Sequence, residues 1–257
     1  MNSREAIIAL VIKYNAQWDE VMRALTQREE PEEEYYLQYK KMKCNVVTII
    51  DPEYPVQLKH VVKPPLALFY YGDLSIASSY YNNISIVGSR DCSDYGVKIT
   101  TEIAGDLAAK GYVIVSGLAR GIDATAHEAA INRGGKTVAV LGTGIDYCYP
   151  PENLKLYYKI KKDHLLISEY PRNASPEQEP FPYRNRIIAG LSKTLVVTEA
   201  KYQSGSLITV TFALNGNADV MCVPHHAGEQ SECNRLIMKG AIMVENANDV
   251  IEEMSRY

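Results

Sequence analysis

The feature that most constrains the fold is an alternation that begins at Ile84. From there onward, short apolar runs are followed by glycine-rich turns and then by stretches with helical periodicity. The apolar runs lack polar alternation, which is typical of strands that are covered on both faces by helices. Because strand–helix–strand units connect parallel neighbours by right-handed crossovers, the alternation predicts an α/β fold with a doubly wound, mostly parallel sheet.

The apolar runs give the expected strands: Ile84–Val87, Tyr112–Val115, Thr137–Leu141, Leu165–Ile167, Thr194–Val197 and Val220–Val223. The expected helices are Asp94–Lys110, Asp123–Arg133, Glu152–Lys162, Arg184–Leu191, Leu207–Asn217 and Asn248–Met254. Two further strands are expected upstream, at residues 46–50 and 66–71, on either side of a proline-rich stretch.

The N-terminal part reads as short helices. Apolar residues fall at helical spacing in two stripes, Ile7, Ile8, Val11 and Ile12, and then Trp18, Val21, Met22 and Leu25. We therefore predict a small helical (SAM-like) domain over residues 1–45 and a sheet domain over residues 46–257.

Composition indicates the compartment. The five cysteines are widely spread and contain no C-x-x-C, which favours reduced thiols in the cytoplasm. No apolar run approaches the roughly 18–20 residues that a bilayer requires, and the N-terminus lacks a signal-peptide pattern. We expect a cytoplasmic protein that does not bind membranes.

Net charge argues only weakly against nucleic acid. The whole chain has a formal charge of −4, but residues 84–210 hold 15 Lys and Arg against 13 Asp and Glu, which gives +2. The middle of the chain can therefore bind anions despite the acidic total.

Glycine, serine and arginine concentrate where the expected strands end. The segments are Gly88-Ser89-Arg90, Ser116-Gly117 with Arg120-Gly121, Arg184-Asn185-Arg186 and Ser204-Gly205-Ser206. Backbone N–H groups, helix N-termini and guanidinium groups together bind polyanions. In any one loop, tight turns and surface solvation explain the residues equally well, but several such loops at one sheet edge favour an anion site. Asp123 is expected to cap the following helix, and Phe181 and Tyr183 are candidates for stacking on bases.

The sequence also resembles a known family. The ordered motifs S-I-V-G-S-R, V-S-G-L-A-R-G-I-D-A-T-A-H, Y-P-P-E-N-L, S-E-Y-P, F-P-Y-R-N-R-I-I-A-G-L-S and V-T-E-A-K-Y-Q-S-G-S-L-I-T resemble the DNA-processing protein A (DprA/Smf) family over about residues 51–250. The resemblance implies an extended Rossmann-like fold, a homodimer, and non-catalytic binding of single-stranded DNA. It also implies protection of incoming DNA and loading of the RecA recombinase during natural transformation.

The family motifs match Gly88, Ser89, Arg90, Arg120, Arg184, Arg186, Ser204 and Ser206. The sequence departs from the family at His225-His226, where a glycine is usual, and at Asn217, where an arginine is usual. These departures put the last edge of the sheet in question.

Other functions fit less well. Cys222, His225, His226 and Cys233 lack a recognised zinc spacing, so no metal is expected. His127 is better explained as a packed histidine than as a base. Glu199 beside the serine loop is expected to hold Arg184 or Arg186, or a ribose hydroxyl.

The serious alternative is a nucleoside-monophosphate phosphoribohydrolase, although the order of loop and glutamate differs and no acid–base pair is visible. A pure scaffold for partner proteins leaves the arginines unexplained. We predict no cofactor and no catalysis.

Overall fold

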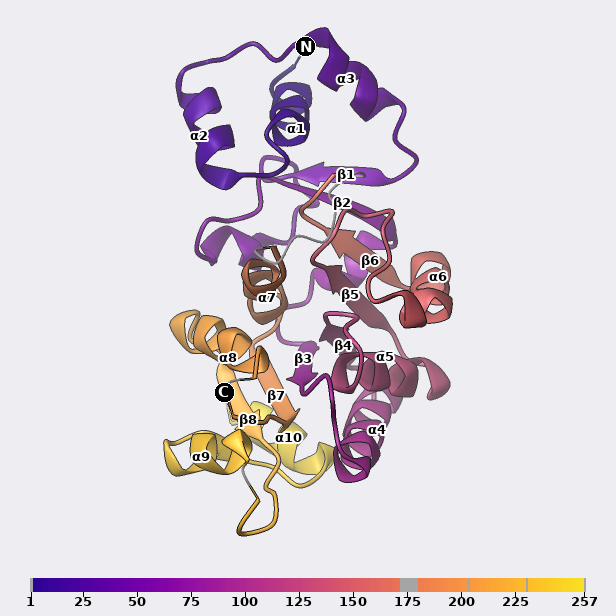
Figure 1. Cartoon of the computed structure of the whole chain (residues 1–257), viewed down its shortest axis with the longest axis vertical. Coiled ribbons are helices and arrows are strands. Elements are labelled where there is room, and N and C mark those ends of the chain that lie inside the picture. The colour runs from indigo at the N-terminus through magenta and orange to yellow at the C-terminus, as the bar shows by residue number, and fades with distance from the viewer. Residues whose placement is uncertain (1, 172–179, 203, 230, 257) are drawn as a thin grey trace.

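One sheet organises the molecule (Figure 1). The computed structural model describes residues 2–171, 180–202, 204–229 and 231–256, and within them nine strands are hydrogen-bonded in the order β1-β2-β6-β5-β4-β3-β7-β8-β9. The strands β6, β5, β4, β3, β7, β8 and β9 run parallel to one another, whereas β2 is antiparallel to both β1 and β6. The strands are β1 (Asn45–Thr48), β2 (Ala67–Gly72), β3 (Asn83–Gly88), β4 (Val113–Ser116), β5 (Thr137–Leu141), β6 (Leu165–Ser168), β7 (Thr194–Glu199), β8 (Asp219–Cys222) and β9 (Ile242–Met243).

Helices cover both faces of the sheet. Along β5, Val138 and Val140 belong to one core cluster and Ala139 and Leu141 to another, as the alternation of side chains across a strand requires. The first face packs against α7 (Pro180–Gly190), α8 (Ser206–Asn215) and α9 (Glu232–Met238). The second packs against α4 (Asp94–Ala109), α5 (Ile122–Asn132), α6 (Leu154–Asp163) and α10 (Ala247–Met254). Short 3-10 turns lie at η1 (Val56–His60), η2 (Leu74–Ala77) and η3 (Pro151–Asn153).

The predicted fold class is confirmed. Every predicted strand lies within two residues of an observed one at each end. The sequence prediction missed β9 and α9, because a two-residue strand and a seven-residue helix are too short to carry a periodic signal. The edge that the His225-His226 departure put in question is formed, since β8 pairs with both β7 and β9.

The N-terminal helices pack on the β1–β2 end of the sheet (Figure 1). They are α1 (Ser3–Lys13), α2 (Trp18–Thr26) and α3 (Glu33–Lys40). Buried residues of α1 such as Ile8 share one apolar cluster with Phe69 and Leu166 of the sheet. The indole of Trp18 also donates a hydrogen bond to the carbonyl of Pro64, at 3.0 Å. The helical segment therefore shares a core with the sheet, and a domain boundary at residue 45 stays a prediction.

No helix among the described residues combines the length and the apolar character that crossing a membrane requires.

A buried ion pair connects α7 to the segments before β2 and after β6. Arg186 is 1% exposed and donates to Glu169 Oε1 at 2.6 Å. The guanidinium also donates to the carbonyls of Lys63 at 2.9 Å and Val62 at 3.1 Å, and its central carbon lies 3.9 Å from the ring centre of Tyr183. Burial raises the pKa of Glu169, so its charged form depends on this arginine.

We expect Arg186→Met to lower the free energy of unfolding by about 3–5 kcal/mol, because the substitution strands a buried carboxylate. Urea titration followed by circular dichroism measures the change. Adding Glu169→Met should recover much of the loss, since the unpaired charge is then gone. A loss below about 1 kcal/mol in the single variant would show that the pair does not stabilise the fold.

Candidate nucleic-acid interface

The candidate site lies where the order of strands reverses. From β3 the chain adds β4, β5 and β6 on one side and later β7, β8 and β9 on the other. Open parallel sheets bind ligands beyond the carboxyl ends of the strands at such a reversal. A cavity of about 400 Å³, hereafter the central cavity, occupies this position, and its lining includes Gly88, Ser89, Arg90, Asp91, Ala119, Asp123, Arg184, Asn185, Lys201, Ser204, Gly205 and Ser206.

The structure brings most of the predicted site residues together. The central cavity holds eight of them: Gly88, Ser89, Arg90, Arg184, Asn185, Ser204, Gly205 and Ser206. Gly117 and Arg120 line an adjoining cavity of about 310 Å³, hereafter the side cavity. Ser116, Gly121 and Arg186 line neither one. Ser116 is buried and donates to the carbonyl of Ile86 at 2.6 Å, and Arg186 is occupied by the ion pair described above. These two side chains stabilise the fold and do not line the cavity.

Two glycines allow the chain at the end of β3 to approach the loop after β4 and the end of β7 closely. Gly121 has φ +77°, and a Cβ on it would lie 2.4 Å from the carbonyl oxygen of Ser89. A Cβ on Gly88 would lie 2.7 Å from the carbonyl oxygen of Glu199. Any side chain at either position would push the loops apart. Gly121 therefore serves the site by bringing its walls together.

Arg184 places a buried charge beneath the cavity. Its Nη1 donates to the carbonyl of Gly117 at 2.8 Å and to that of Val140. Burial lowers its pKa to about 10, which leaves the guanidinium protonated at neutral pH. The neighbouring Asp123 carboxylate accepts from the N–H groups of Gly117 at 3.2 Å and Ala119 at 3.4 Å, and burial raises its pKa. The prediction that Asp123 caps α5 is wrong: the N-cap is Gly121, and Asp123 organises the loop instead.

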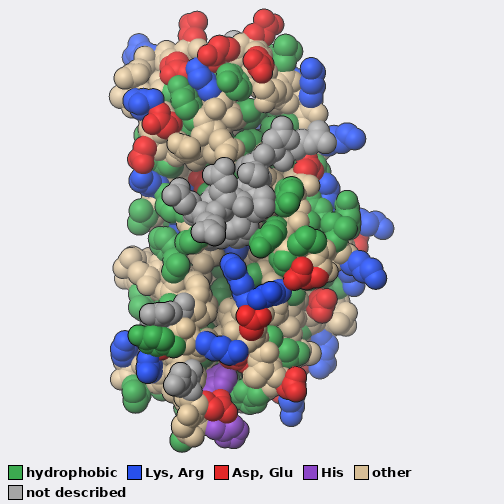
Figure 2. Space-filling model, in the orientation of Figure 1, with side chains coloured by type: hydrophobic (Ala, Val, Ile, Leu, Met, Phe, Trp, Pro, Cys, Tyr) green, Lys and Arg blue, Asp and Glu red, His purple; other side chains and the backbone are tan. Residues whose placement is uncertain are grey.

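Exposed cations stand at the rim of the cavity. Arg90 is exposed and has no hydrogen bond or ion pair to any residue of the described ranges. Arg120 pairs with Asp91 at 2.9 Å, and Lys201 Nζ donates to the Asp91 carbonyl at 2.5 Å. Exposed pairs of this kind contribute at most about 1 kcal/mol, so a phosphate can replace them at small cost. Figure 2 shows Lys and Arg side chains, with acidic ones among them, near the middle of this face.

The prediction omitted Lys201, although the residue was visible in the sequence. It follows the end of β7 by two residues, at the same sheet edge as the arginines. Lys201 belongs to no glycine or arginine motif, but its position just after a predicted strand indicates that it lies at the site.

The serine loop Ser204-Gly205-Ser206 precedes α8 and forms another part of the wall of the central cavity. Ser204 Oγ and Ser206 Oγ lie 2.7 Å apart, and a Cβ on Gly205 would meet nothing within 4 Å. The N-terminus of α8 carries a partial positive charge, which favours an anion in the open space above Gly205.

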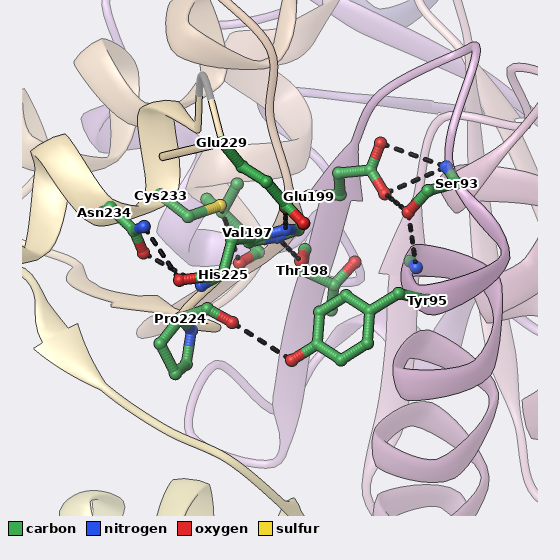
Figure 3. Close-up of polar contacts among 11 residues, drawn as sticks. Ser93, Tyr95, Val197, Thr198, Glu199, Pro224, His225, Glu229, Cys233 and Asn234 are labelled. Carbon is green, nitrogen blue, oxygen red and sulfur yellow. Dashed lines mark hydrogen bonds and ion pairs between the residues drawn. The ribbon is translucent and has the colours of Figure 1, made fainter. Parts of the chain in front are cut away.

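Glu199 acts on the backbone rather than on an arginine. Its Oε2 accepts from Ser93 Oγ at 2.6 Å, and both carboxylate oxygens accept from the Ser93 N–H (Figure 3). The prediction that Glu199 holds Arg184 or Arg186 is therefore wrong. The carboxylate instead fastens the end of β7 to the N-cap of α4, which steadies the loop that carries Arg90.

His225 is built into the end of β8 (Figure 3). Its Nε2 lies 3.1 Å from the carbonyl oxygen of Thr198, and its backbone exchanges two hydrogen bonds with the Asn234 side chain. Hydrogen bonding to Cys233 raises the pKa of His225 to about 9. The pKa of the Cys233 thiol is lowered to about 6, chiefly by a hydrogen bond with Cys222 and to a smaller extent by the one with His225. Among the described residues, no group of three or more His, Cys, Asp or Glu side chains is arranged to hold a metal ion.

Three other candidates have roles away from the cavity or fall outside the structure. His127 is buried, its Nδ1 lies 2.6 Å from Thr137 Oγ1, and burial lowers its pKa to about 3. It is a packed histidine. Tyr183 stacks on Arg186 within the protein. The side chain of Phe181 lies outside the described residues.

Comparison with known proteins shows the family and supports the fold. Residues 45–255 match the model of the family described as DNA recombination-mediator protein A. DNA processing protein DprA of Streptococcus pneumoniae is 43% identical over 208 residues, which are 80% of this chain and 73% of that protein. The X-ray structure of that species' protein superposes with a TM-score of 0.85 at 35% identity, covering 98% of each chain.

A second solved structure is that of DNA processing protein A from Helicobacter pylori, described for its unique single-stranded DNA binding mode. It has a TM-score of 0.74 at 28% identity and covers 84% of this chain and 97% of the other. With a matching family model over most of its length and a close relative over four-fifths of it, this chain belongs to the DNA recombination-mediator protein A (DprA/Smf) family.

Proposed function

We propose that this protein binds single-stranded DNA across the carboxyl edge of its sheet and performs no chemistry on it. The observation that carries the proposal is the central cavity, where a buried Arg184, the exposed Arg90 and Lys201 and the N-terminus of α8 converge from separate elements. Each of these groups favours an anion, and together they suit successive phosphates.

A strand suits this site better than a single nucleotide or a duplex. The central and side cavities share Arg90, Ala119 and Arg184, so they adjoin and form one groove. A mononucleotide would fill only part of it. Ser89 and Arg184 are almost fully buried in the cavity floor, so a backbone must bend inward to reach them. A single strand bends in this way more easily than a duplex does.

The carboxylates nearest the site support binding without catalysis. Asp123 accepts from loop N–H groups, and Glu199 accepts from Ser93. Both are thereby engaged in holding loops, and within the described ranges neither is hydrogen-bonded to a histidine or to a second carboxyl group as in an acid–base pair.

We further propose that the protein acts in the cytoplasm as a homodimer that protects incoming DNA and loads RecA onto it during natural transformation. The family's description as a recombination mediator supports this role. The C-terminal face offers a candidate dimer surface around Met238, which is 83% exposed. Most of the neighbouring apolar residues, Val244 and Val250 among them, pack into the core instead.

Replacing the exposed rim cation Arg90 should weaken binding without unfolding the protein. For Arg90→Ala we expect lower affinity for every single-stranded sequence, and a slope of log affinity against log salt that is reduced by about 0.7. Fluorescence anisotropy on labelled oligonucleotides across a salt series measures both. Arg133→Ala, which removes an exposed arginine paired with Asp106 at the end of α5, is the matched control. Equal behaviour of the two variants would contradict the proposed site.

The same preparation tests the enzymatic alternative. Incubation with nucleoside monophosphates should release no free base, as followed by chromatography, because the described residues that line the cavity include no acid–base pair. Base release that Arg90→Ala reduces would instead establish a phosphoribohydrolase.

A further inference from the structure

We propose that the loop between β5 and α6 forms a base-binding subsite in which Tyr149 stacks on one base of the bound strand and Glu152 accepts a hydrogen bond from it. The inference rests on the proposed binding of single-stranded DNA and extends it to the side cavity. It assigns to that cavity a ligand, a base that carries an exocyclic amino group.

Continuity with the central cavity brings a strand to this loop. Arg90, Ala119 and Arg184 contribute to both cavities, and Arg120 and Tyr149 line only the side cavity. In the sheet order, β4 lies beside β3 and β5 lies beside β4, so the loops after these three strands follow one another along the same edge. A nucleotide next to one held in the central cavity therefore enters the side cavity.

The loop holds its aromatic ring on a rigid support. Thr143 Oγ1 donates to the carbonyl of Tyr147 at 2.7 Å, which closes the start of the loop. At its far end, Asn153 Nδ2 donates to the carbonyl of Leu118 at 2.9 Å. Leu118 adopts φ +57°, a left-handed conformation that a β-carbon disfavours and that this hydrogen bond helps to hold. Because both ends are fixed, Tyr149 needs little further ordering when it binds.

The lining suits a base more than a phosphate. Tyr149 lines the side cavity and is 42% exposed, and an aromatic ring at such a position suits stacking on a base. Glu152 lines the same cavity, and its carboxylate repels phosphate but accepts hydrogen bonds from exocyclic amino groups. Cytosine, adenine and guanine carry such a group, whereas thymine offers only its ring N3–H as a donor. Arg120, which is only loosely engaged by Asp91, lies where it can contact the phosphate of this nucleotide.

The test for stacking compares two exposed tyrosines. We expect Tyr149→Ala to weaken binding of a cytosine oligonucleotide by about fivefold or more, with the salt slope unchanged, since no charge is removed. Tyr158→Ala is the matched control, because Tyr158 is 58% exposed on α6 and does not line the cavity. It should change affinity by less than about twofold. Equal affinities for the two variants would overturn the subsite.

The test for base contact compares cytosine and thymine oligonucleotides of equal length. Glu152→Ala should lower the ratio of cytosine to thymine affinity, chiefly by weakening cytosine binding. An unchanged ratio would overturn the role of Glu152, while thermal melting checks that each variant is folded. If the unsubstituted protein bound no single strand at all, the proposed function itself would fail, whereas normal binding that Arg90→Ala weakens and Tyr149→Ala spares would overturn only this subsite.

Discussion

The reversal of strand order at β3 is the constraint on which the rest of the structure depends. Because the chain builds outward from β3 in both directions, the carboxyl ends of β4, β3 and β7 lie side by side although they are far apart in sequence. Helices on both faces block the sides of the sheet, so the edge beyond these ends is where a ligand can reach several loops at once. The central cavity occupies that edge.

The arginines near this edge have two different roles. Arg186 and Arg184 are buried and held by fixed partners: both donate to backbone carbonyls, and Arg186 also donates to Glu169. Arg90 and Arg120 are exposed and either unpaired among the described residues or held by one surface aspartate. The fixed partners of a buried guanidinium offset the cost of removing it from water. Such an arginine is therefore held in place and forms part of the wall of the groove. The exposed ones remain available to phosphates.

Carboxylates around the groove serve its loops. Asp123 accepts a hydrogen bond from the backbone of the turn after β4, and Glu199 accepts one from Ser93 and so links the start of α4 to the end of β7. Each thereby steadies a loop that carries a cation. Negative side chains beside an anion site are thus compatible with binding, because backbone N–H and hydroxyl donors already occupy their oxygens.

Residue patterns alone determined the α/β class, most of the strands and helices to within a few residues, and the gathering of glycine- and arginine-rich loops at one sheet edge, because apolar periodicity and glycine placement are local signals. The tertiary structure decided which members of those motifs face the groove. Arg184 and Arg186 lie two residues apart on one helix, yet only Arg184 lines the central cavity. Lys201 joins the site and Gly121 only shapes it. Such differences arise from burial and from partners distant in sequence, Glu169 for Arg186 and Ser89 for Gly121, which no local pattern encodes.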